Sequence, residues 1–95
     1  MRVISRKAIV EFIRRHPSAS PSLESWYQIV RRADWNSLVD VKKIYPSADQ
    51  VGRQTVFNIS GNQFRLVARI NYRIKAVFVL HILTHQAYDK GGWKQ

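Results

Sequence analysis

One short polar segment near the C-terminus carries residue types that can move protons. In Thr84-His-Gln-Ala-Tyr-Asp-Lys90 an imidazole, a phenol, a carboxylate and an ammonium stand within seven positions. An imidazole can accept or donate a proton near neutral pH, and a phenol can serve as an acid. Cleaving RNA without a metal needs such a base and acid together with a cation for the phosphate charge. The segment is therefore a candidate catalytic site, although a lone histidine after a strand is more often structural.

Positive charge is concentrated in the half of the chain that contains this segment. The sequence has sixteen Lys and Arg residues against six Asp and Glu, a formal charge of +10, and the part after position 50 contributes seven basic residues and one acid. An ordinary surface mixes both signs, so this excess predicts a polyanionic partner, with RNA or DNA first. From charge and strand position we expect the binding surface to include Asn58, Arg65, Arg69, Arg73, Lys75 and Lys90, with Asp89 at its edge.

A metal site and a bound cofactor are not expected from these residues. The sequence has no cysteine, and in an extended segment His81 and His85 would stand about 13 Å apart, too far to share one zinc ion. A two-metal nuclease needs clustered carboxylates, whereas the basic half has only Asp89. The sequence also contains no glycine-rich phosphate loop and no nucleophile motif. We therefore expect chemistry without metal or cofactor.

The first half of the chain predicts the helices that must support this site. Residues 3–4 predict a short strand, and residues 5–16 predict a helix that a proline ends. Ser20-Pro21 predicts a cap and the first turn of a second helix, which runs to about residue 33. Ser37 and Asp40 resemble a capping box ahead of a third, shorter helix.

The second half predicts three antiparallel strands. After a loop at residues 47–53 the apolar period changes from about 3.6 to 2. We expect strands at residues 55–60, 64–71 and 76–83. The Gly61-Asn62 turn predicts a hairpin whose register pairs Ile59 with Phe64 and Asn58 with Arg65.

This register assigns the strand residues to two different faces of the sheet. Apolar side chains such as Phe57, Leu66 and Ala68 point at the helices, whereas Arg65 and Arg69 point away from them. Residues 1–95 are therefore expected to form a single α+β domain, an antiparallel sheet with N-terminal helices packed on one face and basic residues on the other.

Aromatic residues near the strand ends have two possible roles. Tyr72, Tyr88 and Trp93 could stack on the bases of single-stranded RNA, or they could be core residues. Trp26, Tyr27 and Trp35 fall in helical segments, where packing is the expected role.

Beyond these patterns, five motifs together resemble the HigB-type toxins of bacterial toxin–antitoxin pairs. The motifs occur in the order and spacing of that family and cover nearly the whole chain. They are Asp34-Trp, Tyr45-Pro-Ser-Ala, Val56-Phe-Asn-Ile-Ser-Gly-Asn, Phe64-Arg-Leu-Val and Thr84-His-Gln-Ala-Tyr-Asp.

The resemblance implies a fold, an activity and partners. It implies a RelE-like fold and an endoribonuclease that cuts mRNA, usually in the ribosomal A site. With the residue types above, the expected reaction is attack of the 2′-hydroxyl on the adjacent phosphate, which leaves a 2′,3′-cyclic phosphate. It also implies a helix-turn-helix antitoxin of the HigA type that masks the activity, with operator DNA contacted only through the antitoxin complex.

The resemblance also implies roles for individual residues. Arg65 matches the sheet arginine that stabilises the phosphate, and His85, Tyr88 and Asp89 match the C-terminal motif. The family often has an acid before the tyrosine, where this chain has Ala87, so Asp89 is left with two possible roles, orienting His85 or capping the tail.

Two other functions are compatible with the charge. A protein of the same shape could bind RNA or the ribosome without cutting, and a DNA-binding regulator is a weaker alternative because no predicted helix is basic along one face. A membrane location is not expected, because the longest apolar run, residues 76–80, is far below the roughly 20 residues that span a bilayer. We expect the protein in the cytoplasm.

Overall fold

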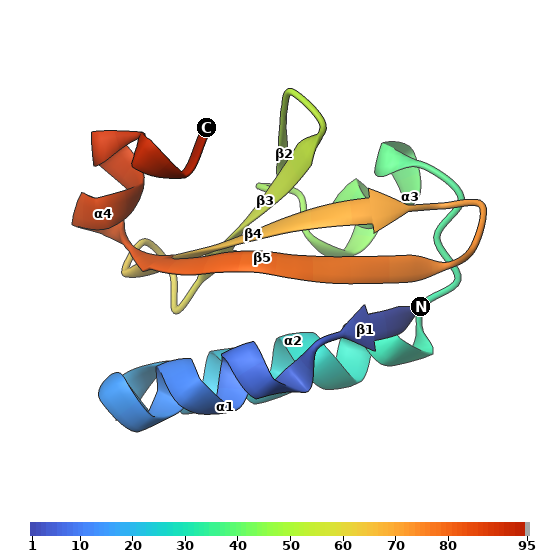
Figure 1. The fold of residues 1–95 in the computed structure, drawn as a ribbon. Coiled ribbons are helices and arrows are strands. Elements are labelled where there is room, and N and C mark those ends of the chain that lie inside the picture. The colour runs from blue at the N-terminus through green and yellow to red at the C-terminus, as the bar shows by residue number, and fades with distance from the viewer. Residues whose placement is uncertain (95) are drawn as a thin grey trace.

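The computed structural model describes residues 1–94, which form one five-stranded sheet with helices on both sides of it (Figure 1). The strand order is β1-β5-β4-β3-β2, and the sheet is mixed because β1 runs parallel to β5 while the other pairs are antiparallel. The α+β class is confirmed. The elements in chain order are β1 (Arg2–Ile4), α1 (Arg6–Arg15), the 3₁₀ helix η1 (Pro17–Ala19), α2 (Ser20–Arg32), α3 (Leu38–Ile44), β2 (Asp49–Val51), β3 (Gln54–Ile59), β4 (Phe64–Asn71), β5 (Ala76–Thr84), α4 (His85–Lys90) and the 3₁₀ helix η2 (Gly92–Lys94).

The two long helices cover one face of the sheet, as the apolar spacing predicts (Figure 1). Ile9 and Phe12 of α1 and Leu23, Trp26 and Val30 of α2 are buried. These side chains contact the sheet residues that were predicted to face them, so the main core lies between α1, α2 and the strands. Within residues 1–94, no helix is both long and apolar enough to cross a membrane.

The helix starts differ in detail from the sequence prediction. Ser20 is the first residue of α2 rather than its cap, and its cap position is held by Ala19. Ser37 does stand at the cap of α3, but its side chain makes no capping bond. The Asp40 carboxylate instead accepts a hydrogen bond from the Asn36 backbone N–H at 2.9 Å, which lowers the pKa of Asp40. Neither hydrogen bond of the predicted box is therefore formed, because the carboxylate accepts from the N–H one position before the cap.

The hairpin register agrees with the prediction. Ile59 pairs with Phe64 and Asn58 pairs with Arg65. The chain turns through residues 60–63, with positive φ at Ser60 and Gly61. Because side chains alternate along a strand, this register directs Phe57, Leu66 and Ala68 into the main core and Arg65 and Arg69 to the other face, here called the second face.

Besides the two 3₁₀ helices, two short elements were not predicted. The expected loop at residues 47–53 contains β2, and the polar segment after β5 folds into the helix α4. Both lack a periodic apolar pattern: β2 has three residues, and α4 has six residues, none of which is buried. Sheet pairing and tertiary packing, rather than local pattern, therefore decide their conformation.

Candidate active site

Arg65 is the most buried cation on the second face. Only 8% of the Arg65 surface is exposed. Nη1 donates to the backbone oxygens of Phe64 and Asn62, at 3.1 and 3.3 Å, and Nη2 donates to Asn62 Oδ1 at 3.1 Å. Within residues 1–94, no carboxylate forms an ion pair with this guanidinium. A nearly buried positive charge held by neutral acceptors favours an external anion.

His85 lies between Arg65 and a carboxylate. Arg65 Nη2 is 3.1 Å from His85 Nδ1, and His85 Nε2 is 3.1 Å from Asp89 Oδ2. A guanidinium carries only donors, so Nδ1 must be the accepting nitrogen, and Nε2 carries the proton that it donates to Asp89. The sequence left Asp89 between two roles, and this geometry matches the one that orients His85.

Helix α4 brings His85 and Asp89 together because they stand four positions apart, one helical turn. Thr84 begins the helix: its Oγ1 accepts from the Ala87 N–H at 3.1 Å. The His85 backbone N–H donates to Gln63 O at 3.0 Å. The hairpin turn that holds Arg65 therefore also anchors the first residue of α4.

Tyr88 completes the cluster from the next turn of α4. Its ring lies 5.5 Å from the Arg65 guanidinium carbon, within the range of a cation–π contact. The other side of the cluster is closed by Trp93, which is 6% exposed and packs with Val56 and Val67. Trp93 is therefore part of a small second core and is not available to stack on a base.

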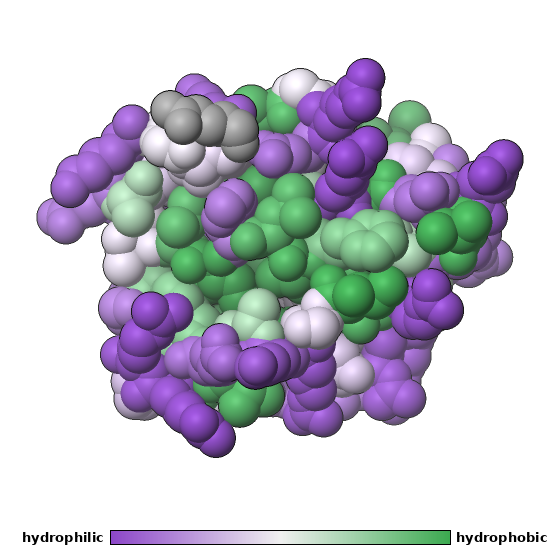
Figure 2. All heavy atoms as spheres, in the orientation of Figure 1, coloured by the Kyte–Doolittle hydropathy of each residue, from purple (hydrophilic) through white to green (hydrophobic). Residues whose placement is uncertain are grey.

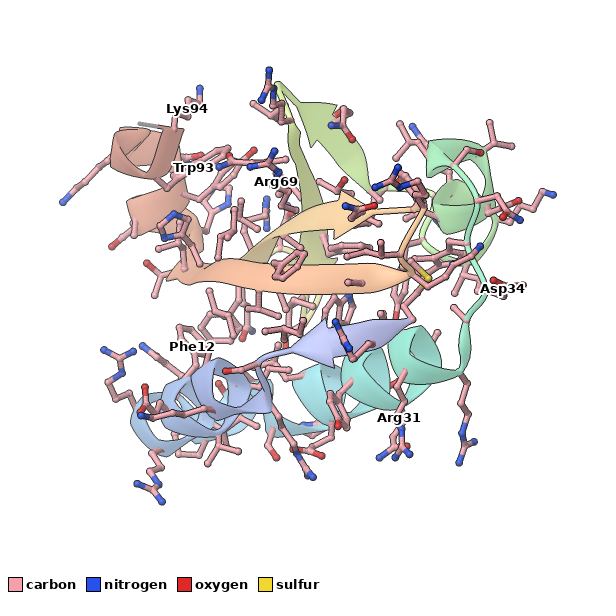
Figure 3. All side chains as sticks on the ribbon, turned by 45° about the vertical axis from the view of Figure 1, so that its right-hand side comes forward. Phe12, Arg31, Asp34, Arg69, Trp93 and Lys94 are labelled. Carbon is pink, nitrogen blue, oxygen red and sulfur yellow. The ribbon has the colours of Figure 1, made fainter. Side chains whose placement is uncertain are left out.

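Beyond Trp93 the second face is open. Two adjoining hollows, of about 420 and 360 Å³, share Arg69 and Leu80. Half-buried Phe78 and exposed Leu80 form an apolar floor, and apolar surface is visible along the course of β5 in Figure 2. Arg69, Arg53 and Lys94 line these hollows and are exposed. Figure 3 shows Arg69, Trp93 and Lys94 on the side of the sheet opposite Phe12 and Arg31.

Comparison with known proteins assigns this arrangement to a family. Residues 19–91 match the HigB toxin family, described as the RelE-like toxic component of a toxin–antitoxin system. The chain belongs to this family. It is 30% identical over 93 residues to mRNA interferase HigB of Escherichia coli O6:H1 strain CFT073, covering 95% of this chain and 90% of that protein. It is 24% identical over 92 residues to mRNA interferase toxin HigB of Escherichia coli K12 and to mRNA interferase HigB of Shigella flexneri, covering 94% of this chain and 88% of each relative.

The family assignment agrees with the fold and implies an antitoxin partner. A toxic component of a toxin–antitoxin system acts together with an antitoxin that restrains it, and the five-stranded sheet with packed helices is consistent with the RelE-like fold. Of the residues that the sequence proposed, this HigB-family structure brings Arg65, His85, Tyr88 and Asp89 into one cluster.

The other proposed binding residues lie at different distances from this cluster. Asn58 neighbours Arg65 through the β3–β4 register, and Lys90 is exposed at the end of α4. Arg73 and Lys75 instead follow β4 in the turn to β5, and the nine-residue strand β5, about 27 Å long, lies between them and His85. The structure does not bring these two residues to the cluster.

Lys75 has partners of its own at that far end. Its Nζ is 2.8 Å from Asp34 Oδ1 and donates to Trp35 O at 2.9 Å and to Asn36 Oδ1 at 2.7 Å. The hydrogen bond from Lys75, together with its charge, lowers the pKa of Asp34. Nearby Tyr72 packs against the main core, where burial raises the pKa of its phenol.

Sequence reasoning missed the contribution of Asn62. It was treated only as a turn residue, but its backbone and side-chain oxygens both accept from Arg65. A signal was present, since Asn62 precedes the candidate arginine by three positions in a tight hairpin. Arg53 and Lys94, which line the open hollows, were also not predicted as site residues. No local pattern indicates which basic residues the fold brings together on the second face.

Proposed function

We propose that this HigB-family toxin is an mRNA endoribonuclease that acts in the ribosomal A site without a metal ion. The relatives named above are called mRNA interferases, and the cluster of Arg65, His85, Tyr88 and Asp89 has the residue types that this reaction requires. The observation that carries the proposal is Arg65, a nearly buried cation with neutral hydrogen-bond partners and a histidine within 3.1 Å.

The proposed reaction uses the substrate's own nucleophile. The ribose 2′-oxygen attacks the adjacent phosphorus, and its proton passes to a base on the enzyme. The bond from phosphorus to the 5′-oxygen breaks, the departing oxygen takes a proton from an acid, and a 2′,3′-cyclic phosphate remains. Negative charge grows on the non-bridging oxygens during this step, and the Arg65 guanidinium stabilises it.

His85 serves as the base in this proposal. Its Nδ1 carries the lone pair and faces the guanidinium that binds phosphate, while Nε2–H is held by Asp89. Charged phosphate oxygens are stronger acceptors than carbonyl groups, so phosphate binding draws Arg65 towards the substrate and releases Nδ1. Asp89 then stabilises the imidazolium that forms, and Tyr88, whose ring lies against Arg65, donates the proton to the leaving 5′-oxygen.

The open hollows beyond Trp93 offer a path for the RNA strand. Arg69, Arg53 and Lys94 would contact phosphates, and the Phe78 ring would contact a base. His85 and Asp89 are exposed, with 47% and 60% of their side chains accessible, so the fold alone does not enclose a substrate. Presentation of the mRNA by the ribosome supplies the missing positioning.

The decisive experiment compares His85→Ala with His81→Ala. We expect His85→Ala to lower the rate of mRNA cleavage by about 100- to 10,000-fold and to abolish growth arrest on induction. His81 pairs with Val67 in the β4–β5 register, so it is a nearby histidine, but within residues 1–94 it makes no bond to Arg65, His85, Tyr88 or Asp89. His81→Ala should therefore retain both activities. Primer extension on cellular mRNA after induction measures the cuts, and circular dichroism checks the fold. Undiminished cleavage by His85→Ala would contradict the proposal.

Two further measurements test the role of the ribosome and the product of the proposed reaction. Cleavage of a message with its codon in the A site should exceed that of the same free RNA by at least about 100-fold if the ribosome positions the substrate. Equal rates would remove the ribosome from the proposal. The fragments should end in a 2′,3′-cyclic phosphate, whereas attack by a metal-activated water would leave linear ends.

A non-catalytic RNA- or ribosome-binding protein is the second candidate. It is favoured by the cation-lined hollows, which need no catalytic cluster to bind RNA. Under that function, wild-type induction would leave transcripts uncut, and primer extension separates the two. The antitoxin is proposed to be a helix-turn-helix protein of the HigA type; an adjacent reading frame whose product binds this chain and blocks cleavage would support that assignment.

A further inference from the structure

The segment after α4 folds back over the second face of the sheet. Gly91 has φ = 77°, a left-handed conformation that glycine adopts without strain, and it ends the helix and reverses the chain. Trp93 then reaches the sheet, where it packs with Val56 and Val67 and is 6% exposed. Figure 3 shows its side chain directed toward the strands from the α4 end of the molecule.

Trp93 contacts Tyr88 in two independent ways. The two rings are stacked, with centroids 4.8 Å apart and an angle of 16° between their planes. The indole Nε1–H also donates to the Tyr88 backbone oxygen at 2.9 Å. One contact fixes the ring of Tyr88, and the other fixes its backbone.

Helix α4 has few other means of holding its position. It has six residues, and none of them is buried. Helices of this length are not stable by themselves in water. The Thr84 cap and the backbone bond to Gln63 anchor the first turn, so the second turn, which carries Tyr88 and Asp89, depends on the contact with Trp93.

We infer that Trp93 is a positioning residue, which holds Tyr88 against Arg65 and so sets the geometry of the cluster. A continuous series of contacts runs from Val67 in the sheet through Trp93 and Tyr88 to the Arg65 guanidinium. The inference rests on the proposed function for the catalytic role of Tyr88, but the placement of Tyr88 can be measured without any RNA.

The test compares Trp93→Phe and Trp93→Ala with Trp35→Phe. Trp35 is a suitable control because its indole is also stacked on an aromatic ring, that of Phe57, and is 2% exposed, but it lies in the main core. Its Nε1 is buried and has no hydrogen-bond partner within residues 1–94. Trp93→Phe therefore removes an N–H that holds Tyr88, whereas Trp35→Phe removes an N–H without a partner.

The first readout is the aromatic NMR spectrum of the free protein, with labelled tyrosine and arginine. Loss of the indole ring current moves the Tyr88 signals in any case, so placement is read from the NOEs between the Tyr88 ring and the Arg65 side chain. Trp93→Ala should weaken these NOEs, Trp93→Phe should weaken them less, and Trp35→Phe should leave them unchanged. Unchanged NOEs in both Trp93 variants would overturn the inference.

The second readout is single-turnover cleavage on programmed ribosomes. Loss of one hydrogen bond in Trp93→Phe should lower kcat by roughly 5-fold, and loss of the ring in Trp93→Ala by roughly 100-fold. KM should change less in both, and Trp35→Phe should alter melting temperature without lowering kcat. Wild-type kcat in Trp93→Ala, beside an inactive His85→Ala, would contradict the positioning role. If the wild type itself did not cleave mRNA, the proposed function would fail and the NMR result alone would decide this inference.

Discussion

Arg65 and Lys75 occupy opposite ends of the same sheet, and they differ in what neutralises them. Arg65 is nearly buried and is held by carbonyl oxygens, an amide oxygen and an imidazole. Lys75 is held by the Asp34 carboxylate at 2.8 Å and by two further oxygens. Asp34 lies at the end of the molecule away from Trp93 in Figure 3.

The difference shows why a net charge does not locate a binding site. A carboxylate partner offsets the charge of a cation and so weakens its attraction for phosphate. The charge of a cation held by neutral groups is not offset in this way. Of the two, only Arg65 is poised to bind an anion. Exchanging the partners of each cation tests this contrast.

Of the changes that test this contrast, removal of the Arg65 side chain should have the largest effect. We expect Arg65→Ala to lower the cleavage rate by about 100- to 1,000-fold, because the phosphate charge loses its stabilising donor. Arg65→Lys keeps the charge but loses the forked geometry, so it should recover only part of the rate. The measurement is single-turnover cleavage on programmed ribosomes. A fully active Arg65→Ala would mean that Arg65 contributes no more to cleavage than Lys75 at the other end of the sheet.

A carboxylate partner should make Arg65 less available to phosphate, as Lys75 already is. In Asn62→Asp, a carboxylate oxygen replaces the amide oxygen that lies 3.1 Å from Nη2. The new ion pair competes with phosphate, so we expect cleavage to slow by about 10-fold or more while the melting temperature does not fall. Asn62→Ser is the matched control, because it leaves the guanidinium without a carboxylate. Equal rates in Asn62→Asp and the wild type would show that the charge of the group bonded to Arg65 does not affect cleavage.

A smaller effect is expected at Arg69, on the open part of the same face. If Arg69 contacts one phosphate, Arg69→Ala should weaken RNA binding and reduce the slope of log K against log salt concentration by about 0.7, the value for single strands. Lys75→Ala should leave that slope unchanged. A salt titration of the binding of a short RNA measures both variants, and equal slopes in Arg69→Ala and the wild type would exclude the phosphate contact.

The smallest effect is expected at Asp34, and it should depend on pH. The pKa of Asp34 in the fold is lowered by Lys75, so the ionised carboxylate stabilises the fold above the unfolded pKa of about 3.9. Asp34→Asn should lower the melting temperature slightly at pH 7. That difference should shrink as the pH falls below about 4 and vanish below the folded pKa. The exposed position of Asp34, 82% accessible, keeps the effect small and sensitive to salt.

Cleavage provides the complementary check on Asp34→Asn. Freeing Lys75 from its carboxylate should not raise the cleavage rate, because β5 separates Lys75 from His85. A rate increase would show that a free cation at this end also serves the reaction.

The hairpin and the helices show how far the sequence could predict this fold. The pairing of Asn58 with Arg65 follows from turn chemistry and alternation, both of which depend on near neighbours. The same reasoning located α1, α2 and the three long strands. It missed β2 and α4, because three- and six-residue elements show no periodicity and are held by contacts with distant parts of the chain.

The candidate site was predicted in part for the same reason. Arg65, His85, Tyr88 and Asp89 were identified from residue type and family motifs, and the structure joins them. Trp93 was left between base stacking and packing, and its contacts with Val56 and Val67 decide for packing. Those contacts join residues more than twenty positions apart, which no local pattern encodes.

The sequence alone was enough to predict the long helices and strands, the two faces of the sheet, the excess of positive charge and the family resemblance, because each depends on local spacing or composition. Which cations are free depends instead on the tertiary structure. Lys75 meets the loop at Trp35 across 40 positions, and Arg65 meets His85 across 20. A charge in the sequence is a residue type, but its availability to RNA depends on which distant groups the fold places beside it.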